Sequence, residues 1–210
     1  MPNNALKTIR DIKLNTIAVF FVPFILSFFF IYLIGIQSCN DEEDPNIDLN
    51  NELHYDTNNN SAPDLLEGVH ESAIRFESRD LLPYQSRTLS AVKIFIAHVP
   101  TDLTLRIYTD GRSNTPGNLL YEAALVGVKS NQWNVIELTS GLIIGNDGLW
   151  ISLRFSLNET QRVIGCDRGP AFINGDWAFN QYDNNWRSLR NRTNNQLSVN
   201  WNIRAVLKPK

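Results

Sequence analysis

The distribution of apolar and polar residues divides the 210-residue chain into three stretches. Residues 14–36 contain no charged side chain and are dense in Phe, Ile, Leu and Val. Residues 40–64 are rich in Asn and Asp and have no hydrophobic period. From Val69 onwards, apolar and polar residues alternate with a period of two, which is typical of β-strands with one buried face. We therefore expect a membrane-entering segment, a disordered tether and an all-β domain.

The alternation within the third stretch predicts about nine β-strands. It is clearest in residues 103–108, 149–155 and 199–205, where every second residue is apolar. Weaker strand patterns occupy six further segments, which are residues 70–76, 89–97, 119–126, 133–138, 176–179 and 186–189.

Turn-forming residues separate many of these strands, and helical patterns are scarce. Gly and Asn supply the positive φ that hairpins need, and Pro presets its own φ. Only residues 78–84 suggest a helical turn, which Pro83 limits. Short strands without covering helices bury their apolar faces by packing two sheets together. We predict a two-sheet jelly-roll β-sandwich, with turns at Asp110-Gly111, Pro116-Gly117, Ser140-Gly141, residues 146–148, Gly169-Pro170 and Asn174-Gly175.

The apolar stretch is long enough to enter a membrane. As a helix, residues 14–36 would be about 35 Å long, which exceeds the hydrocarbon core of a bilayer. Basic residues precede this stretch and the acidic run at residues 41–44 follows it, so the positive-inside rule keeps the N-terminus in the cytoplasm. We expect the rest of the chain to be exported.

The four residues Ile36-Gln37-Ser38-Cys39 resemble the lipobox of bacterial lipoproteins. The resemblance implies cleavage before Cys39, a thioether-linked diacylglycerol on its thiol and an acylated amino group, which together form a stable membrane anchor. An uncleaved signal-anchor helix is the alternative, because the apolar run exceeds the usual signal-peptide core. The predicted parts are a lipoprotein signal peptide (1–38), an acidic tether (39–67) and a β-sandwich domain (68–210).

The acidic run behind Cys39 resembles the export signal that sends many Bacteroidota lipoproteins to the outer face of the outer membrane. It implies a lipid-anchored protein at the cell surface; periplasmic retention is the alternative. The strand pattern is also similar to a β-sandwich domain of Bacteroidota surface lipoproteins, related to adhesin-type jelly rolls. This second resemblance implies a non-catalytic module and rests on residues 73–76, 89–94, 105–108, 116–121, 133–138, 148–151, 165–170 and 200–204.

The composition of the chain argues against several classes of partner and cofactor. The chain has 19 Lys and Arg against 22 Asp and Glu and a formal net charge of −3, so no basic stripe is available for nucleic acid. If Cys39 is lipidated, Cys166 has no partner within the chain and the fold lacks an internal disulfide. His54, His70 and His98 are scattered singly, and the chain contains no CxxC or HExxH motif, which argues against zinc.

Aromatic residues suggest a ligand site. Trp177, Tyr182 and Trp186 lie in an irregular region rich in Asn and Asp, where a rigid scaffold commonly displays binding residues. We predict that they form a platform for glycan, and the alternative is that they anchor loops. Trp201 shares a face with apolar neighbours and is expected in the core, whereas Trp150 is on the opposite face, either exposed or covered by a loop.

Carboxylates in the same region suggest calcium. Asp167, Asp176 and Asp183 could gather around a Ca²⁺ ion, which takes six to eight oxygen ligands. The alternative is that each Asp caps its own turn, as Asp does in Gly- and Asn-rich loops.

We expect no catalysis. A glycosidase would need Asp176 and Asp183 at a fixed separation, and a Cys166 nucleophile would need a helper such as His98. The sequence thus favours a non-catalytic cell-envelope lipoprotein that binds glycan or protein at the cell surface. A structural or assembly component of an envelope complex is the first alternative, and a glycan-active enzyme is the second.

Overall fold

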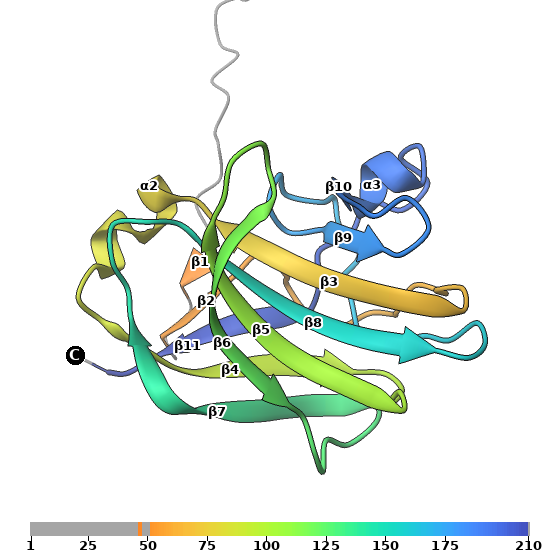
Figure 1. The fold of residues 1–210 in the computed structure, drawn as a ribbon, viewed down its shortest axis with the longest axis horizontal. Coiled ribbons are helices and arrows are strands. Elements are labelled where there is room, and N and C mark those ends of the chain that lie inside the picture. Colours follow the sequence, from red (N-terminus) through yellow and green to blue (C-terminus); the bar gives the residue numbers. More distant parts are fainter. Residues whose placement is uncertain (1–45, 48–50, 210) are drawn as a thin grey trace, which may run out of the picture. The chain divides into compact units, whose positions relative to one another are not determined.

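The computed structural model describes residues 46–47 and 51–209, and their strands form two antiparallel sheets packed face to face (Figure 1). The five-stranded sheet contains, in spatial order, β1 (Asn46–Ile47), β2 (Glu52–His54), β11 (Ile203–Leu207), β4 (Thr88–Ile96) and β7 (Gln132–Ile143). The six-stranded sheet contains β10 (Asn185–Ser188), β9 (Trp177–Asn180), β3 (Gly68–Phe76), β8 (Leu149–Leu157), β5 (Asp102–Asp110) and β6 (Pro116–Ala124).

The topology is that of a jelly roll. Eight strands form two four-stranded arrays in the orders β2-β11-β4-β7 and β3-β8-β5-β6. Taken in chain order, successive members of these eight strands lie in opposite sheets, except at the β5–β6 hairpin; β9 and β10 intervene between β8 and β11. β1 extends the first array at its β2 edge, and β9 and β10 extend the second beside β3. The predicted jelly-roll sandwich is therefore confirmed.

The core lies between the sheets and is built from the apolar residues of the alternating pattern. Ile74, Leu105 and Ile151 on the six-stranded sheet are fully buried, as are Val92 and Ile203 on the five-stranded sheet. The predicted core position of Trp201 is also confirmed: its side chain is inaccessible, and its indole N–H donates to the carbonyl of Trp177 at 2.9 Å.

Each predicted strand overlaps an observed one, with some shifts. The last strand begins at Ile203 rather than Val199, because the side chains of Asn200 and Asn202 are buried and donate to Asp167 and Asp56 respectively. Two predicted turns are wrong. Pro116-Gly117 opens β6, and Ser140-Gly141 lies within β7, where the pairing with β4 shifts register.

The sandwich begins earlier than the predicted boundary at residue 68. Residues 1–45 and 48–50, which include the predicted signal peptide and Cys39, lie outside the described residues. Within the predicted tether, however, β2 pairs with β11, and Leu53 is 1% exposed in the core. The sequence around Leu53 is polar, so its hydrophobicity was too low to predict a strand.

Ion pairs on the outer face of the five-stranded sheet offset the cost of burying the charged residues in and directly after β2. Arg204 of β11 donates to Glu52 at 3.0 Å and to Asp56 at 2.7 Å, and Lys93 of β4 reaches Glu52 at 2.7 Å. The Arg204 guanidinium lies 4.5 Å from the ring centroid of Trp133, within cation–π range. Partners distant in sequence therefore make burial of the charged residues in and after β2 tolerable.

Helical structure is limited to short segments. The predicted turn at residues 78–84 is confirmed as α2 (Ser78–Leu81) and the 3₁₀ helix η1 (Leu82–Tyr84), and α3 (Leu189–Arg192) follows β10. Across the part of the chain that the structure describes, no helix combines the length and apolar character needed to span a membrane.

The placement of β2 can be tested at Leu53. Replacing Leu53 with Ala leaves a cavity between the sheets, and we expect the free energy of unfolding to fall by about 2–5 kcal/mol in urea denaturation. Val126, which is 94% exposed, provides the control, since Val126→Ala should change it by less than about 0.5 kcal/mol. Equal stabilities of the two variants would contradict the inclusion of β2 in the sandwich.

Candidate functional site

A depression of about 290 Å³ lies on the outer face of the six-stranded sheet. Its lining comes from β3, β8, β5, the start of β6, β9 and β10. Outward side chains of neighbouring strands meet here in cross-strand rows. One row contains Trp186, Phe179, Glu71 and Arg154, and the remaining lining residues are Arg106, Tyr108, Thr115, Pro116 and Gly117.

The carboxylate of Glu71 is at the base of the depression. Its side chain is only 4% exposed. Oε1 accepts hydrogen bonds from the Ser152 hydroxyl at 2.6 Å and from the Tyr108 hydroxyl at 3.0 Å. A buried carboxylate needs such partners because desolvation penalises its charge. Glu71 is thus held in a fixed orientation by two neutral donors.

Two arginines stand over the other oxygen of Glu71, at longer distances. Arg154 Nη1 lies 3.4 Å from Glu71 Oε2, and Arg106 Nη1 lies 3.7 Å from the same atom. Arg106 has a closer partner on β6, where its Nε lies 2.6 Å from Glu122 Oε2. The depression therefore presents two partly exposed guanidinium groups above a buried carboxylate.

Tyr108 remains a neutral hydrogen-bond donor in this setting. Burial, reinforced by the charge of Glu71, raises the pKa of Tyr108 to about 12. Its hydroxyl therefore stays protonated at physiological pH and continues to donate to Glu71.

Aromatic residues form the wall of the depression on the β9–β10 side. The Trp186 ring lies 5.3 Å from Trp150 and 5.8 Å from Phe179, measured between centroids. Trp150 is inaccessible to solvent and donates its indole N–H to Asp110 at 2.7 Å. Of the two positions expected for Trp150, exposed or covered, the structure shows the covered one, with Trp177 and Trp186 packed against its ring.

The three residues of the predicted aromatic platform do not act as one surface. Trp177 is 9% exposed, packs against Trp150 at 5.0 Å and donates to Asn174. Tyr182 is 63% exposed in the turn between β9 and β10, with its hydroxyl bound to the carbonyl of Glu67. Only Trp186 lines the depression.

The three predicted calcium ligands have separate structural roles. Asp167 accepts from the backbone N–H groups of Gly169 and Asn200, and Asp183 forms an ion pair with Arg192 at 2.8 Å. Asp176 is inaccessible and accepts from the N–H of Arg190 at the start of α3. The described residues contain no cluster of three or more His, Cys, Asp or Glu that could hold a metal, so these carboxylates do not form one calcium site.

Cys166 and His98, which were considered for catalysis, differ in burial. Cys166 is buried, and burial together with the neighbouring Asp167 raises its pKa to about 11, which disfavours the nucleophilic thiolate. His98 is exposed and lines a second hollow, of about 250 Å³, at one end of the sandwich.

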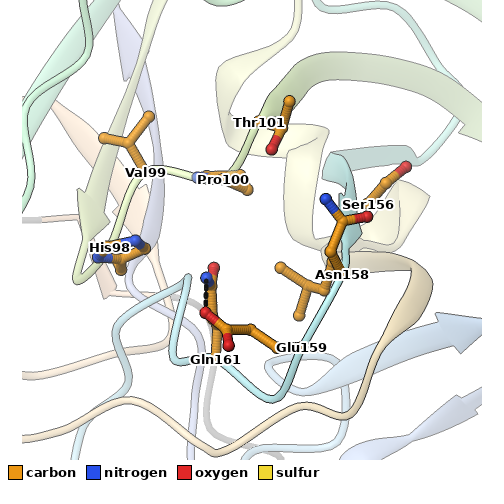
Figure 2. A pocket seen from close by; sticks show the side chains of 9 residues that line it. His98, Val99, Pro100, Thr101, Ser156, Asn158, Glu159 and Gln161 are labelled. Atoms are coloured by element: carbon orange, nitrogen blue, oxygen red, sulfur yellow. Dashed lines mark hydrogen bonds between the residues drawn. The ribbon is translucent and has the colours of Figure 1, made fainter.

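This end hollow is formed by the loop between β4 and β5, the end of β8 and the residues that follow β8. Figure 2 shows His98, Val99, Pro100 and Thr101, between β4 and β5, facing residues that follow or end β8. Gln161 donates to Glu159 at 3.3 Å across its floor. No Trp, Tyr or Phe lines this hollow, so the depression on the sheet is the better candidate for a ligand with flat apolar faces.

The sequence-based search missed Glu71, Arg106 and Arg154. The available sign was their position: each is a charged residue at an outward place in a strand that otherwise alternates. Such residues usually mark a solvated sheet face. That these three converge follows from the adjacency of β3, β8 and β5, which the alternation alone does not specify.

Comparison with known proteins supplies no family for the chain. No protein-family model, curated protein or solved structure matches it. The resemblance to surface lipoproteins of Bacteroidota stays a prediction.

Asp176 is expected to make stability depend on pH. Burial raises the pKa of Asp176 from 3.8 to about 6, so its contribution to stability is full below pH 4 and is lost as the pH rises through 6. Asp176→Asn removes this titration. Relative to wild type, the variant should gain about 2–3 kcal/mol of unfolding free energy between pH 4 and pH 7, measured by urea denaturation.

The control for this experiment is Asp183→Asn. Its hydrogen bond with Arg192 lowers the pKa of Asp183, so the stabilisation it provides is present above its ordinary pKa and lost as the pH falls. The two variants should change the pH profile in opposite directions. Profiles for wild type and Asp176→Asn that run parallel would contradict the assigned titration.

Proposed function

We propose that the protein binds glycan, without chemistry, in the depression on the six-stranded sheet. The observation that carries the proposal is the row in which the half-buried rings of Trp186 and Phe179 adjoin the polar cluster of Glu71, Arg106 and Arg154. Ligand sites combine apolar surface with a few fixed polar groups in this way.

The aromatic and the charged side chains match the apolar faces and the polar edges of a sugar ring, respectively. The C–H faces of a pyranose ring are flat and stack on aromatic rings, whereas its hydroxyl edges need donors and acceptors in fixed directions. Trp186 and Phe179 provide the ring surface. Arg106 and Arg154 provide planar donors, and the buried Glu71 keeps their guanidinium groups near the base of the depression. The volume, about 290 Å³, suits a short stretch of saccharide.

A second candidate function, recognition of a protein within an envelope complex, is favoured by the exposed edge strands. Leu119 and Leu120 on β6 are 50% and 44% exposed, and Val135 and Ile143 on β7 are 55% and 66% exposed. β6 and β7 are each the last strand of their sheet, and an unpaired edge can accept an added strand.

A non-catalytic role is supported by the state of the acidic groups. Asp176 is inaccessible and Asp183 is paired with Arg192, so neither is placed to serve as one of two glycosidase carboxylates. Glu71 is buried beneath its donors. Glu122, on the neighbouring strand β6, is paired with Arg106.

We further propose that the protein is a lipoprotein held by Cys39 in the outer membrane, with the sandwich at the cell surface. The sequence of residues 36–39 and the acidic run behind them support this location. A glycan site on the sandwich would then face the polysaccharides that surround the cell.

Trp186 provides the test of glycan binding. A glycan-array screen of the full chain in detergent should give at least one hit, and Trp186→Ala should weaken it by about tenfold or more, because the stacking surface is lost. The affinity of each hit can be measured by titration calorimetry.

Tyr182→Ala is the matched control, since it removes an aromatic side chain that is more exposed than Trp186 but lies outside the depression. It should leave binding unchanged. Thermal unfolding of both variants identifies any general loss of structure. Equal binding by wild type and a folded Trp186→Ala variant would refute the proposed site. Loss of glycan binding in Tyr182→Ala alone would also refute it and would place the binding site at the β9–β10 turn.

The anchor is tested at Cys39. In the native host, Cys39→Ser should abolish both palmitate labelling and cleavage of the precursor, since the thiol is the attachment point of the lipid. Unchanged labelling and mobility on a gel would contradict the lipoprotein assignment.

A further inference from the structure

We propose that the glycan carries an anionic group, a carboxylate or a sulfate, which Arg154 binds with support from Arg106. This inference rests on the proposed function, because it assigns the charge of the ligand in the same depression. It specifies the class of ligand, the acidic saccharides, and the side chain that binds the acidic group.

Glu71 does not satisfy the hydrogen-bonding capacity of the two arginines above it. Its close hydrogen bonds, at 2.6 and 3.0 Å, come from the neutral hydroxyl groups of Ser152 and Tyr108. Its contacts with Arg154 and Arg106 are 3.4 and 3.7 Å long. Charge-assisted hydrogen bonds between guanidinium and carboxylate are normally about 2.7–2.9 Å. Glu71 therefore positions the two arginines but forms a close ion pair with neither.

Arg106 and Arg154 differ in their other carboxylate partners. Arg106 has a close carboxylate partner in Glu122, at 2.6 Å. For Arg154, the contact with Glu71 at 3.4 Å is the only ion pair found within the described part of the chain. Its side chain is 35% exposed, so the unused guanidinium N–H groups can reach a ligand. Arg154 is thus the cation better placed to receive an acidic group.

Arg154 lies beside the aromatic wall of the depression. Its guanidinium carbon lies 5.9 Å from the ring centroid of Phe179, and that ring lies 5.8 Å from Trp186. The three side chains belong to one cross-strand row and form a continuous series of flat groups. A saccharide stacked on Trp186 and Phe179 would bring its next substituent to the guanidinium of Arg154, which binds carboxylate and sulfate through two parallel hydrogen bonds.

A carboxylate beside Arg106 limits where the acidic group of the ligand can lie. Glu122, on β6, places a negative charge beside Arg106 and repels an anion approaching from that side. The side formed by β9 and β10 contributes Phe179 and Trp186 to the lining and no carboxylate. The acidic group should therefore lie between Arg154 and the aromatic wall, away from Glu122.

The experiment compares matched saccharides on the full chain in detergent by titration calorimetry. The probes are an oligogalacturonate, the same oligosaccharide after reduction of its carboxylates to primary alcohols, and galactose oligosaccharides with and without sulfate. Arg154→Gln keeps a polar side chain but removes the charge. Arg168→Gln is the control, because Arg168 is exposed and bonded to Asn60 away from the depression.

For wild type, at least one acidic probe should bind about tenfold or more tightly than its neutral counterpart, as expected for hydrogen bonds to a charged group. Arg154→Gln should remove this preference while retaining the affinity for the neutral probe, and Arg154→Lys should restore it in part, because Lys supplies charge without a planar fork. Arg168→Gln should behave as wild type. The probe that wild type prefers distinguishes carboxylate from sulfate.

Two results would overturn the inference while leaving glycan binding intact: neutral probes that bind as tightly as acidic ones, or an acidic preference that survives in Arg154→Gln. If no probe, acidic or neutral, binds in a manner that depends on Trp186, the proposed function itself fails.

Discussion

The structure depends on one constraint, that a charge removed from water must find a partner. Both outer faces of the sandwich bury charged side chains. On the five-stranded sheet, Arg204 is enclosed by Glu52 and Asp56, which attaches β2 to β11. On the six-stranded sheet, Glu71 is enclosed by Ser152 and Tyr108. Losing one member of such a group leaves an uncompensated charge, so these networks restrict the register of the strands that carry them.

The two networks differ in how completely their charged groups are paired. The fully paired network at Arg204 supports the fold, whereas the incompletely paired cluster at Glu71 belongs to the candidate site. Arg204 has close contacts to two carboxylates and to the carbonyl of Thr57. The cluster at Glu71 remains open, with guanidinium groups at long distances from the carboxylate. Strands β9 and β10, added beside the jelly roll, place Phe179 and Trp186 next to it. The depression lies where the extended sheet meets this incompletely paired polar cluster.

Much of this fold was predictable from the sequence, because alternating apolar and polar residues identify the strand faces that point into the core. Residues such as Leu105 and Ile151 alternate with polar neighbours, and both are fully buried. β2 was not predictable, since Glu52 and Asp56 depend on Arg204, about 150 positions later in the chain. For the candidate site, the sequence indicated Trp186 but grouped it with Trp177 and Tyr182, whose burial and position depend on the pairing of β9 with β3. Periodicity identifies the faces of strands, whereas convergence across strands requires their order in the sheet.

The burial of Cys166 has a consequence for the chemistry that the sandwich tolerates. Oxidants and foreign thiols react with the thiolate, and at Cys166 that form is suppressed by a pKa of about 11 and by exclusion of solvent. A lone sulfhydryl in an oxidising compartment is ordinarily prone to mixed disulfides and sulfenic acid. Here the folded chain shields it, so the sandwich needs neither a second cysteine nor a reducing environment to keep its sulfur inert.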